Sequence, residues 1–348
     1  MYNAEKIGSK WAESSLSVGP VKISGRAFLA PMAGVTDPTM RRIAERYGAS
    51  AAVCEMITAA GVARGDRETA LRLGFTDDTN SAPRVIQIAA RDPVEIASAA
   101  KHAEAVGADW IDINMGCPCK RVTGGLAGAA LMRDLDQATV LIAAARAATS
   151  KPVSVKMRLG WDDASRNAPE LARRAEAEGV SLVTVHGRTR QQFYTGRADW
   201  SAIASVKRAI SIPVVANGDC QSPEDAADML NASGADAVMV GRAAQGRPWL
   251  VGEIAYFLAT GRRRPAPSIA ERGDVAREHL EGLIAQMGEG AGLRHARKHL
   301  AAYVDHAFGD GRADVAQLRR ALVTAENPKE AFRLIDVIFT KVSQEVAA

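Results

Sequence analysis

Aromatic residues and cysteines are both scarce in this sequence. Phe, Trp and Tyr make up 5% of the 348 residues, which disfavours recognition of nucleic-acid bases by extended stacking. The cysteines are Cys54, Cys117, Cys119 and Cys220, too few and too scattered for a disulfide scaffold, which favours a reducing compartment. No apolar run approaches the ~18–20 residues of a membrane span, and the polar N-terminus lacks the apolar core of a signal peptide. We therefore expect a cytoplasmic protein without a membrane segment.

Charge and composition exclude little else. The net charge is +4 and the pI is about 8.9, which permits a polyanionic partner without requiring one. A hydrophobic share of 47% and a charged share of 24% are typical of a globular protein. The length suits one large domain or two ordinary ones.

The first two thirds of the chain alternate short apolar runs with Ala-rich helical stretches. The runs are too continuously apolar for half-exposed antiparallel strands, which indicates buried parallel strands. Eight such units predict a (β/α)₈ TIM barrel. A doubly wound sheet is the alternative, but no G-x-G-x-x-G follows the first strand. The predicted strands are residues 26–32, 51–56, 84–90, 110–116, 153–158, 182–187, 213–219 and 237–242.

The pattern changes near residue 252. Residues 259–268, "ATGRRRPAPS", are typical of a linker or exposed turn. Beyond them the periodicity is helical and indicates about four helices. We therefore predict a barrel domain over residues 1–251 and a small helical domain over residues 252–348.

Polar and ionisable residues gather at the carboxyl ends of the predicted strands. The active site of a barrel lies at that end. Each such group carries a desolvation cost that a partner or ligand must offset. These residues are Pro31, Met32, Ala33, Cys54, Glu55, Met56, Gln87, Asn114, Lys156, Arg158, His186, Asn217, Gly218, Asp219, Gly241 and Arg242.

The last two strands end in glycine-rich turns, "ANGD" and "VGR". Backbone amides and Arg242 can approach an anion there, and the loops after strands seven and eight are the usual phosphate site of this fold. Gly-Arg pairs are common in turns. The place of this one, after the eighth strand, is what indicates a phosphate-bearing cofactor or substrate.

Two cysteines, Cys117 and Cys119, stand one residue apart after the fourth strand. From the residues alone, a cysteine there could be a metal ligand, half of a disulfide, a buried filler, or a reactive acid or nucleophile. The pair does not decide between these roles by itself.

Several segments taken together resemble a known family. They are "LAPMAGVTD", "VIQIAARDP", "INMGCPCKRVTGGLAGAALM", "VKMRLGWDD", "TVHGRTRQQFYTGRADW", "VVANGD" and "VGRAAQGRPWL". In this order they resemble the flavin-dependent tRNA-dihydrouridine synthases, most closely the bacterial B-type branch, and "LRHARKHLAAYV" resembles that family's C-terminal helical region. The resemblance implies a flavin-binding barrel followed by a helical domain, with FMN as cofactor, NADPH as electron donor and tRNA as substrate.

The resemblance also implies roles for the two cysteines and their neighbour Asn114. Cys117 would be the proton donor, since uracil reduction needs a hydride at C6 and a proton at C5, and a thiol of pKa ~8.5 is mostly protonated at neutral pH. Asn114 would orient the uracil edge. Cys119 stands where a small residue such as alanine is usual, and we interpret it as a filler. A C-x-C metal or iron–sulfur site with Cys54 and Cys220, or reversible oxidation against Cys117, remains the alternative.

The implied cofactor contacts fall on the other strand ends. Pro31, Met32 and Ala33 would lie against the flavin ring through their backbone. Gln87 would bond the ring's rim, and Lys156 would place positive charge near N1 and O2. His186 would lie by the flavin or its phosphate. The ribityl chain and phosphate would be held by Asn217, Gly218, Asp219, Gly241 and Arg242.

Basic residues outside the strand ends are the candidates for tRNA contact. They are Lys120, Arg121, Arg188, Arg190 and Arg197, with Arg294, Arg297 and Lys298 on one helical face. Since aromatics are few, we expect recognition of the shape of a folded tRNA, with one uridine flipped into the barrel. We expect a monomer with no obligate protein partner.

Two other functions compete with tRNA reduction. A flavin oxidoreductase acting on a small pyrimidine or enone would share the barrel end but would leave the basic helical region without a purpose. A non-catalytic RNA-binding protein on a retired barrel would be free to lose Cys117, Lys156 and His186, which are all present.

Overall fold

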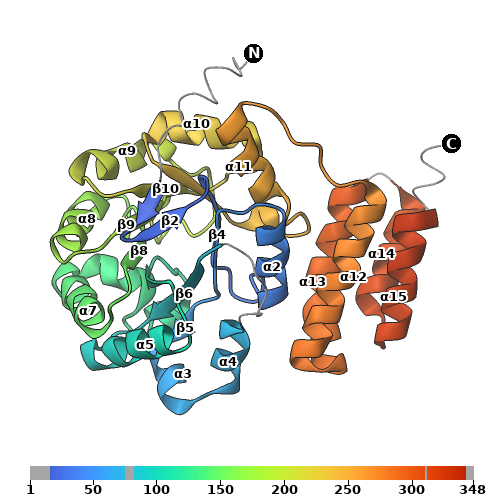
Figure 1. Cartoon of the computed structure of the whole chain (residues 1–348), viewed down its shortest axis with the longest axis horizontal. Helices are drawn as coiled ribbons and strands as arrows, with labels where there is room; N and C mark the ends of the chain where they lie inside the picture. Colours follow the sequence, from blue (N-terminus) through green and yellow to red (C-terminus); the bar gives the residue numbers. More distant parts are fainter. Residues whose placement is uncertain (1–15, 75–81, 310–311, 342–348) are drawn as a thin grey trace.

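Eight parallel strands close into a barrel in the computed structural model, which describes residues 16–74, 82–309 and 312–341 (Figure 1). The sheet runs β4-β3-β11-β10-β9-β8-β7-β6, and a β4–β6 pairing closes it. The bounds are β3 (Ala27–Leu29), β4 (Ala51–Val53), β6 (Arg84–Ala89), β7 (Trp110–Met115), β8 (Val153–Arg158), β9 (Leu182–His186), β10 (Val214–Asn217) and β11 (Ala237–Val240). The TIM barrel predicted from the sequence is confirmed.

The second strand is broken, although the sequence predicted one run over residues 51–56. β4 and a short β5 (Ile57–Thr58) both pair with β6, and the chain leaves the sheet between them. Glu55 lies in this gap, 5% exposed, with its carboxylate 3.2 Å from the Arg72 guanidinium. The ion pair offsets the desolvation cost of the buried carboxylate at the break.

Helices surround the barrel and begin at the signals that the sequence supplies. Asp37, Asp92 and Ser222 each cap a helix that starts with proline. The main outer helices are α2 (Pro38–Arg46), α5 (Pro93–Ala105), α7 (Leu135–Ala148), α8 (Ala168–Ala177), α9 (Trp200–Ala209), α10 (Pro223–Ser233) and α11 (Leu250–Thr260). Shorter pieces are α3 (Ala59–Arg64), α4 (Arg67–Leu73), α6 (Lys120–Thr123), η1 (Gly128–Arg133) and η2 (Arg242–Ala244).

An antiparallel hairpin, β1 (Leu16–Val18) and β2 (Val21–Ile23), precedes the barrel and was not predicted. Its Leu16, Val18 and Ile23 are buried in one cluster with Phe28 and Trp110. Trp110 is the first residue of β7, so the hairpin covers the amino end of the barrel, opposite the strand ends that were expected to carry function.

Four further helices form a bundle with its own core beside the barrel (Figure 1). They are α12 (Ile269–Met287), α13 (Glu289–Phe308), α14 (Ala313–Thr324) and α15 (Pro328–Asp336), followed by a π turn, η3 (Val337–Lys341). We predicted the boundary at residue 251/252, but α11 continues to Thr260, and its Ile254 and Phe257 belong to the barrel core. We therefore propose that the boundary lies in residues 261–268. No helix in the described parts of the chain is long and apolar enough to cross a membrane.

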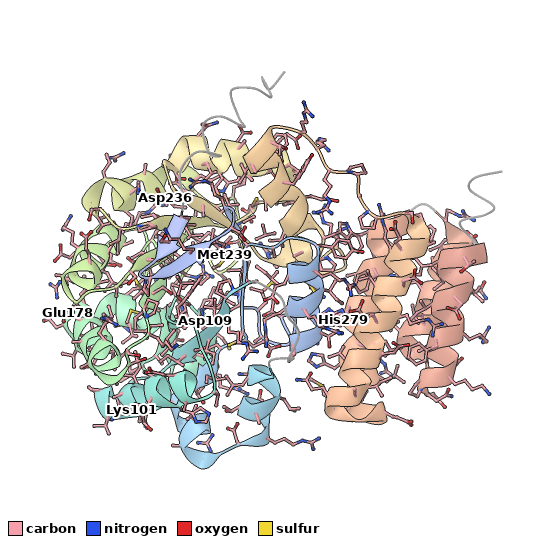
Figure 2. All side chains as sticks on the ribbon, in the orientation of Figure 1. Lys101, Asp109, Glu178, Asp236, Met239 and His279 are labelled. Atoms are coloured by element: carbon pink, nitrogen blue, oxygen red, sulfur yellow. The ribbon has the colours of Figure 1, made fainter. Side chains whose placement is uncertain are left out.

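A buried polar cluster joins the bundle to the barrel. Asp37, the cap of α2, accepts a hydrogen bond from His279 at 3.0 Å, and His279 bonds the Tyr303 hydroxyl at 3.1 Å. His299 lies 3.6 Å from the same carboxylate oxygen. Figure 2 shows His279 where α12 meets α2. Burial alone would raise the pKa of Asp37, but the charge and hydrogen bond of His279 hold it well below its usual range.

Asp37→Ala is expected to lower the free energy of unfolding by about 2–4 kcal/mol, because it removes both a helix cap and a buried charge-assisted hydrogen bond. Urea unfolding of the full chain measures the change. Asp66→Ala is the matched control, since Asp66 caps α4 through Thr69 without a buried histidine partner, and its loss of stability should be clearly smaller. Equal losses would show that the Asp37–His279 contact adds nothing to stability.

Candidate active site

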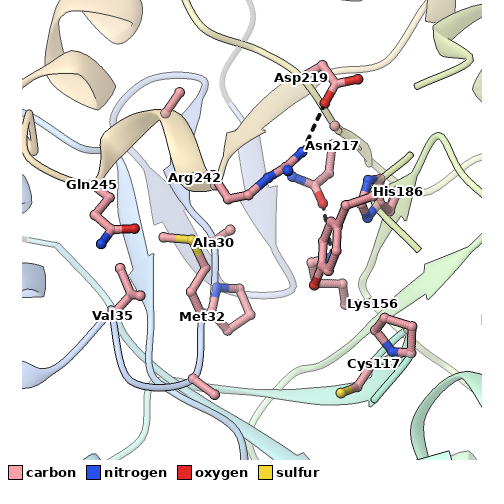
Figure 3. Close-up of a pocket in the computed structure, with 18 of the residues that line it drawn as sticks. Ala30, Met32, Val35, Cys117, Lys156, His186, Asn217, Asp219, Arg242 and Gln245 are labelled. Carbon is pink, nitrogen blue, oxygen red and sulfur yellow. Dashed lines mark hydrogen bonds and ion pairs between the residues drawn. The ribbon is translucent and has the colours of Figure 1, made fainter. Parts of the chain in front are cut away.

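A cavity of about 880 Å³ opens where the carboxyl ends of the strands meet. In Figure 3, Asp219 and Arg242 lie at one end and Cys117 at the other, with Lys156, Asn217 and His186 between them. The structure brings the expected catalytic and cofactor residues into this one cavity. They are Pro31, Met32, Ala33, Gln87, Asn114, Cys117, Lys156, His186, Asn217, Gly218, Asp219, Gly241 and Arg242.

A chain of amide hydrogen bonds forms the floor of the cavity. Asn114 Nδ2 donates to Gln87 Oε1 at 2.8 Å, and Gln87 Nε2 donates to Asp112 Oδ2 at 2.7 Å. Asp112 also accepts from the Ser154 hydroxyl. The carboxylate can only accept, so it fixes which way both amides face. Asn114 is thereby left with one N–H that no bond in the described structure uses.

The Asn114 side chain also sets the position of Cys117. Its Oδ1 accepts from the backbone N–H of Cys117 at 2.9 Å and of Gly116 at 3.2 Å. Burial raises the pKa of the Cys117 thiol, so it stays protonated at neutral pH. A thiol held by its backbone at the cavity wall can deliver a proton.

The other three cysteines do not join Cys117 in a ligand cluster. All four are free thiols, and Cys54 and Cys220 are buried. Cys119 is exposed and also lines the cavity, so the expected half-buried filler is wrong in its exposure. Among the residues the structure describes, no group of three possible metal ligands includes a cysteine. The cysteine metal site that the sequence left open finds no support in this geometry.

Lys156 presents a half-buried positive charge to the cavity. Its Nζ donates to Asn217 Oδ1 at 3.0 Å, and the Asn217 amide donates to the Met239 carbonyl at 2.8 Å. Burial and the charge of Arg158 lower the pKa of Lys156 to about 8. No carboxylate in the described residues lies within ion-pair distance of it. The site can therefore accept an anionic group beside Lys156.

Asp219 lies between two arginines. Arg188 grips its two oxygens at 3.0 and 2.6 Å, and Arg242 approaches Oδ1 at 3.3 Å. The Arg242 side chain is 60% exposed and keeps a face toward the cavity. A carboxylate engaged in this way would repel a phosphate, so Asp219 would act by aiming Arg242 and not by direct contact.

His186 is neutral in this setting. It is 8% exposed, and its Nε2 lies 3.3 Å from Arg188 Nη1. Burial and the positive charges of Lys156 and nearby arginines hold its pKa well below the ordinary value. A neutral imidazole here can accept a hydrogen bond without adding charge.

The residues expected at the RNA surface divide into two groups. Lys120, Arg121, Arg197, Arg294 and Lys298 are exposed, and Arg190 is half-buried. Arg188 was expected there too, but it is 1% exposed and also donates to the Thr195 and Gly196 carbonyls. Because its donors are used inside the protein, it has no surface to offer RNA. Arg297 is half-buried and donates to the Ala325 carbonyl, so it faces the bundle.

Comparisons with known proteins identify the family of this chain. The model of the dihydrouridine synthase (Dus) family matches residues 28–345. The chain belongs to the dihydrouridine synthase family. It is 43% identical over 330 residues to a probable tRNA-dihydrouridine synthase of Rickettsia conorii, with 94% of this chain and 98% of that protein covered. It is 46% identical over 314 residues to the tRNA-dihydrouridine synthase B of Xanthomonas axonopodis pv. citri, with 90% and 92% covered.

Solved structures share the fold at low identity. Histamine dehydrogenase from a Rhizobium species superposes with a TM-score of 0.54 at 14% identity, covering 80% of this chain and 50% of that one. The chain thus spans half the length of that protein. At this identity the likeness shows the barrel fold alone.

Two residues that line the cavity of this dihydrouridine synthase family member were given no role from the sequence: Arg158 was noted only as a strand end, and Tyr194 was not singled out. Arg158, 1% exposed, donates to the carbonyls of Gly116, Thr189 and Phe193 and so ties the loop after β7 to the loop after β9. Burial lowers its pKa to about 10. Tyr194 lines the cavity beneath the Arg242 guanidinium, 4.9 Å from ring centre to Cζ. A role for Arg158 in the cavity could have been inferred, because it ends β8 two residues after Lys156 and so points to the same side.

Proposed function

We propose that this protein reduces uridines in tRNA to 5,6-dihydrouridine with FMN as cofactor and NADPH as electron donor. The observation that carries the proposal is that the Cys117 thiol and the Lys156 side chain line the same cavity, with no carboxylate of the described residues within ion-pair distance of Lys156. The names of the relatives supply the substrate class. The helical bundle would bind the tRNA, and we propose that the protein acts as a monomer.

The residues present fit a flavin mononucleotide. Lys156 is a half-buried cation that donates its hydrogen bond to the neutral Asn217, as suits a ring system that becomes negative on reduction. Arg242 reaches the cavity from the phosphate end of the fold, after β11. Pro31, Met32 and Ala33 would hold the ring from the end of the first strand, and Gly218 and Gly241, which also line the cavity, would lie beside the phosphate.

The chain's own residues would supply the proton and the orientation. FMN would supply the hydride for C6 of the uracil. Cys117 would hold a proton on Sγ for C5, and its raised pKa keeps that proton in place until the carbon becomes basic. The free N–H of Asn114 would bond a uracil carbonyl, and Lys156 would stabilise negative charge as it develops.

Dihydrouridine formation on bulk tRNA, compared with reduction of free uridine, tests the proposal. The protein should carry a yellow flavin and should modify tRNA far faster than the nucleoside. Equal or better turnover of free pyrimidines would favour a small-molecule oxidoreductase. A colourless protein that binds tRNA and does not accept FMN would favour a non-catalytic RNA-binding protein.

Arg242→Ala is expected to weaken FMN binding by about 1.5–3 kcal/mol, roughly tenfold or more, because it removes a charge-assisted hydrogen bond to phosphate. Titration of the deflavinated protein with FMN, followed by flavin fluorescence, gives the dissociation constant. Arg263→Ala is the control, since Arg263 pairs with Glu224 on the outer surface. Undiminished affinity in Arg242→Ala would mean that the phosphate is held elsewhere.

A further inference from the structure

A run of stacked cationic and aromatic side chains leads from the surface toward the cavity. The Arg133 guanidinium lies 5.0 Å from the centre of the Trp161 ring, and that of Arg190 lies 4.6 Å from the same ring. Arg190 also lies 4.7 Å from the Phe193 ring, and Phe193 lines the cavity. We call Arg133, Trp161, Arg190 and Phe193 the cation–aromatic ladder.

Two loops hold the ladder in place. The backbone N–H of Arg190 donates to the Gly160 carbonyl, and that of Gln191 donates to the Trp161 carbonyl, each at 2.9 Å. Phe193 has a left-handed backbone, with φ of +49°, which turns the chain at the cavity mouth. The loops after β8 and β9 are thus laced together where the ladder crosses them.

The two arginines of the ladder carry charge that the protein does not neutralise. In the described parts of the chain neither Arg133 nor Arg190 forms an ion pair or a side-chain hydrogen bond, and the Arg190 Nε is buried without a partner. The nearby acids are already used, since Asp163 pairs with Arg166 and Asp162 bonds Ser165. An arginine held by stacking keeps its N–H edge free, and that edge matches a phosphate.

Arg188 shows what a structural arginine looks like two residues away. It is fully buried, and its donors are taken by Asp219 and by backbone carbonyls. Arg190 is half-buried and stacked, and no acid meets it. This difference in partners indicates that the Arg190 guanidinium is available to bind an anionic group from outside the chain.

We propose that Arg133 and Arg190 hold consecutive phosphates of the RNA strand that brings the target uridine to the cavity, with Trp161 and Phe193 fixing the two guanidinium groups. The proposal rests on the proposed function and adds a strand path to it. Arginines held on a rigid aromatic support lose little freedom on binding, and they contact the phosphate backbone without regard to base. The path ends at Phe193, on the wall that also carries Tyr194.

The double variant Arg133→Gln/Arg190→Gln tests the path. Its affinity for bulk tRNA, measured at several salt concentrations, should fall about tenfold or more. The slope of log K against log[salt] should flatten by about 1.4–1.8, since each lost phosphate contact removes about 0.7–0.9. Arg173→Gln is the control, because Arg173 is an exposed arginine of α8 that already pairs with Glu170.

Trp161→Leu adds a readout that charge alone does not give. It keeps both arginines but removes their support, so affinity should fall about two- to fivefold, in line with lost cation–π contacts. Full affinity in Trp161→Leu would overturn the ladder. Flavin content and thermal unfolding of each variant show that the fold is intact.

The outcomes separate this inference from the proposed function. If the wild-type protein forms no dihydrouridine on tRNA, the proposed function fails. If it does, and the double variant binds tRNA as tightly as Arg173→Gln and with the same salt slope, the ladder inference alone is overturned.

Discussion

Cys117→Ala is expected to lose about 10²–10⁴-fold of its rate of tRNA reduction, the usual contribution of a positioned general acid. The cause is the missing proton for C5, since hydride addition to C6 is not completed when the adjacent carbon cannot be protonated. Reduction of the bound flavin by NADPH should continue, because that step needs no proton from this thiol. Single-turnover measurement of each half-reaction separates the two effects.

The neighbouring thiol provides the matched control for this variant. Cys119→Ala should retain nearly full tRNA reduction, since Cys119 is exposed and nothing in its surroundings prepares it to give a proton. If Cys119→Ala loses turnover while Cys117→Ala keeps it, the assignment of the acid is reversed. Loss of flavin from Cys117→Ala would point instead to a structural role.

Lys156→Met is expected to slow flavin reduction by about 10²–10³-fold, because it removes a half-buried cation placed to meet negative charge in the cavity. Stopped-flow absorbance of the flavin after mixing with NADPH measures the rate. Lys151→Met, two residues before the start of β8 and at the other end of the barrel, is the control and should behave as wild type. A normal rate in Lys156→Met would remove Lys156 from the proposed chemistry.

The pH dependence gives a second test of Lys156. Its pKa of about 8 in the folded protein lies below the ordinary value of about 10.4. The unfolded chain therefore binds more protons between these values, so the cost of burying the charge is present below pH 8 and is relieved as the pH rises. The stability of the flavin-free wild type relative to Lys156→Met should rise from pH 8 to pH 10. A stability difference between the two proteins that does not change with pH would show that the pKa of Lys156 is not lowered in the folded protein.

The strands could be predicted from the sequence because their side chains are buried on both faces, which leaves a continuous apolar run for each. The break in the second strand could not, because Glu55, which lies in it, meets its partner Arg72 on a later helix. The N-terminal hairpin contributes Leu16, Val18 and Ile23, whose burial depends on the barrel that they cover. The local sequence pattern does not show that Glu55 will meet Arg72 or that the hairpin will pack on the barrel.

The contacts of single side chains in the site could not be predicted from the sequence either. Arg188 and Arg190 look alike in the sequence, and both could be expected at an RNA surface. What separates them is Asp219, 31 residues from Arg188, which draws one guanidinium inward and leaves the other out. The cavity residues themselves were found because the carboxyl ends of parallel strands converge in any barrel. Their place follows from topology, while their partners follow from packing.

The segment from Pro31 to Asp37 touches both halves of the molecule. Pro31, Met32 and Ala33 line the cavity, and Asp37 is bonded to His279 of the bundle. A further link joins Gln245, beside the cavity, to the backbone of Lys298 on α13 at 3.4 Å. An RNA bound by the bundle, as we propose, would therefore lie at a fixed distance from the cavity. The contacts between bundle and barrel would then select the target nucleotide by its distance along the bound RNA, whatever bases surround it.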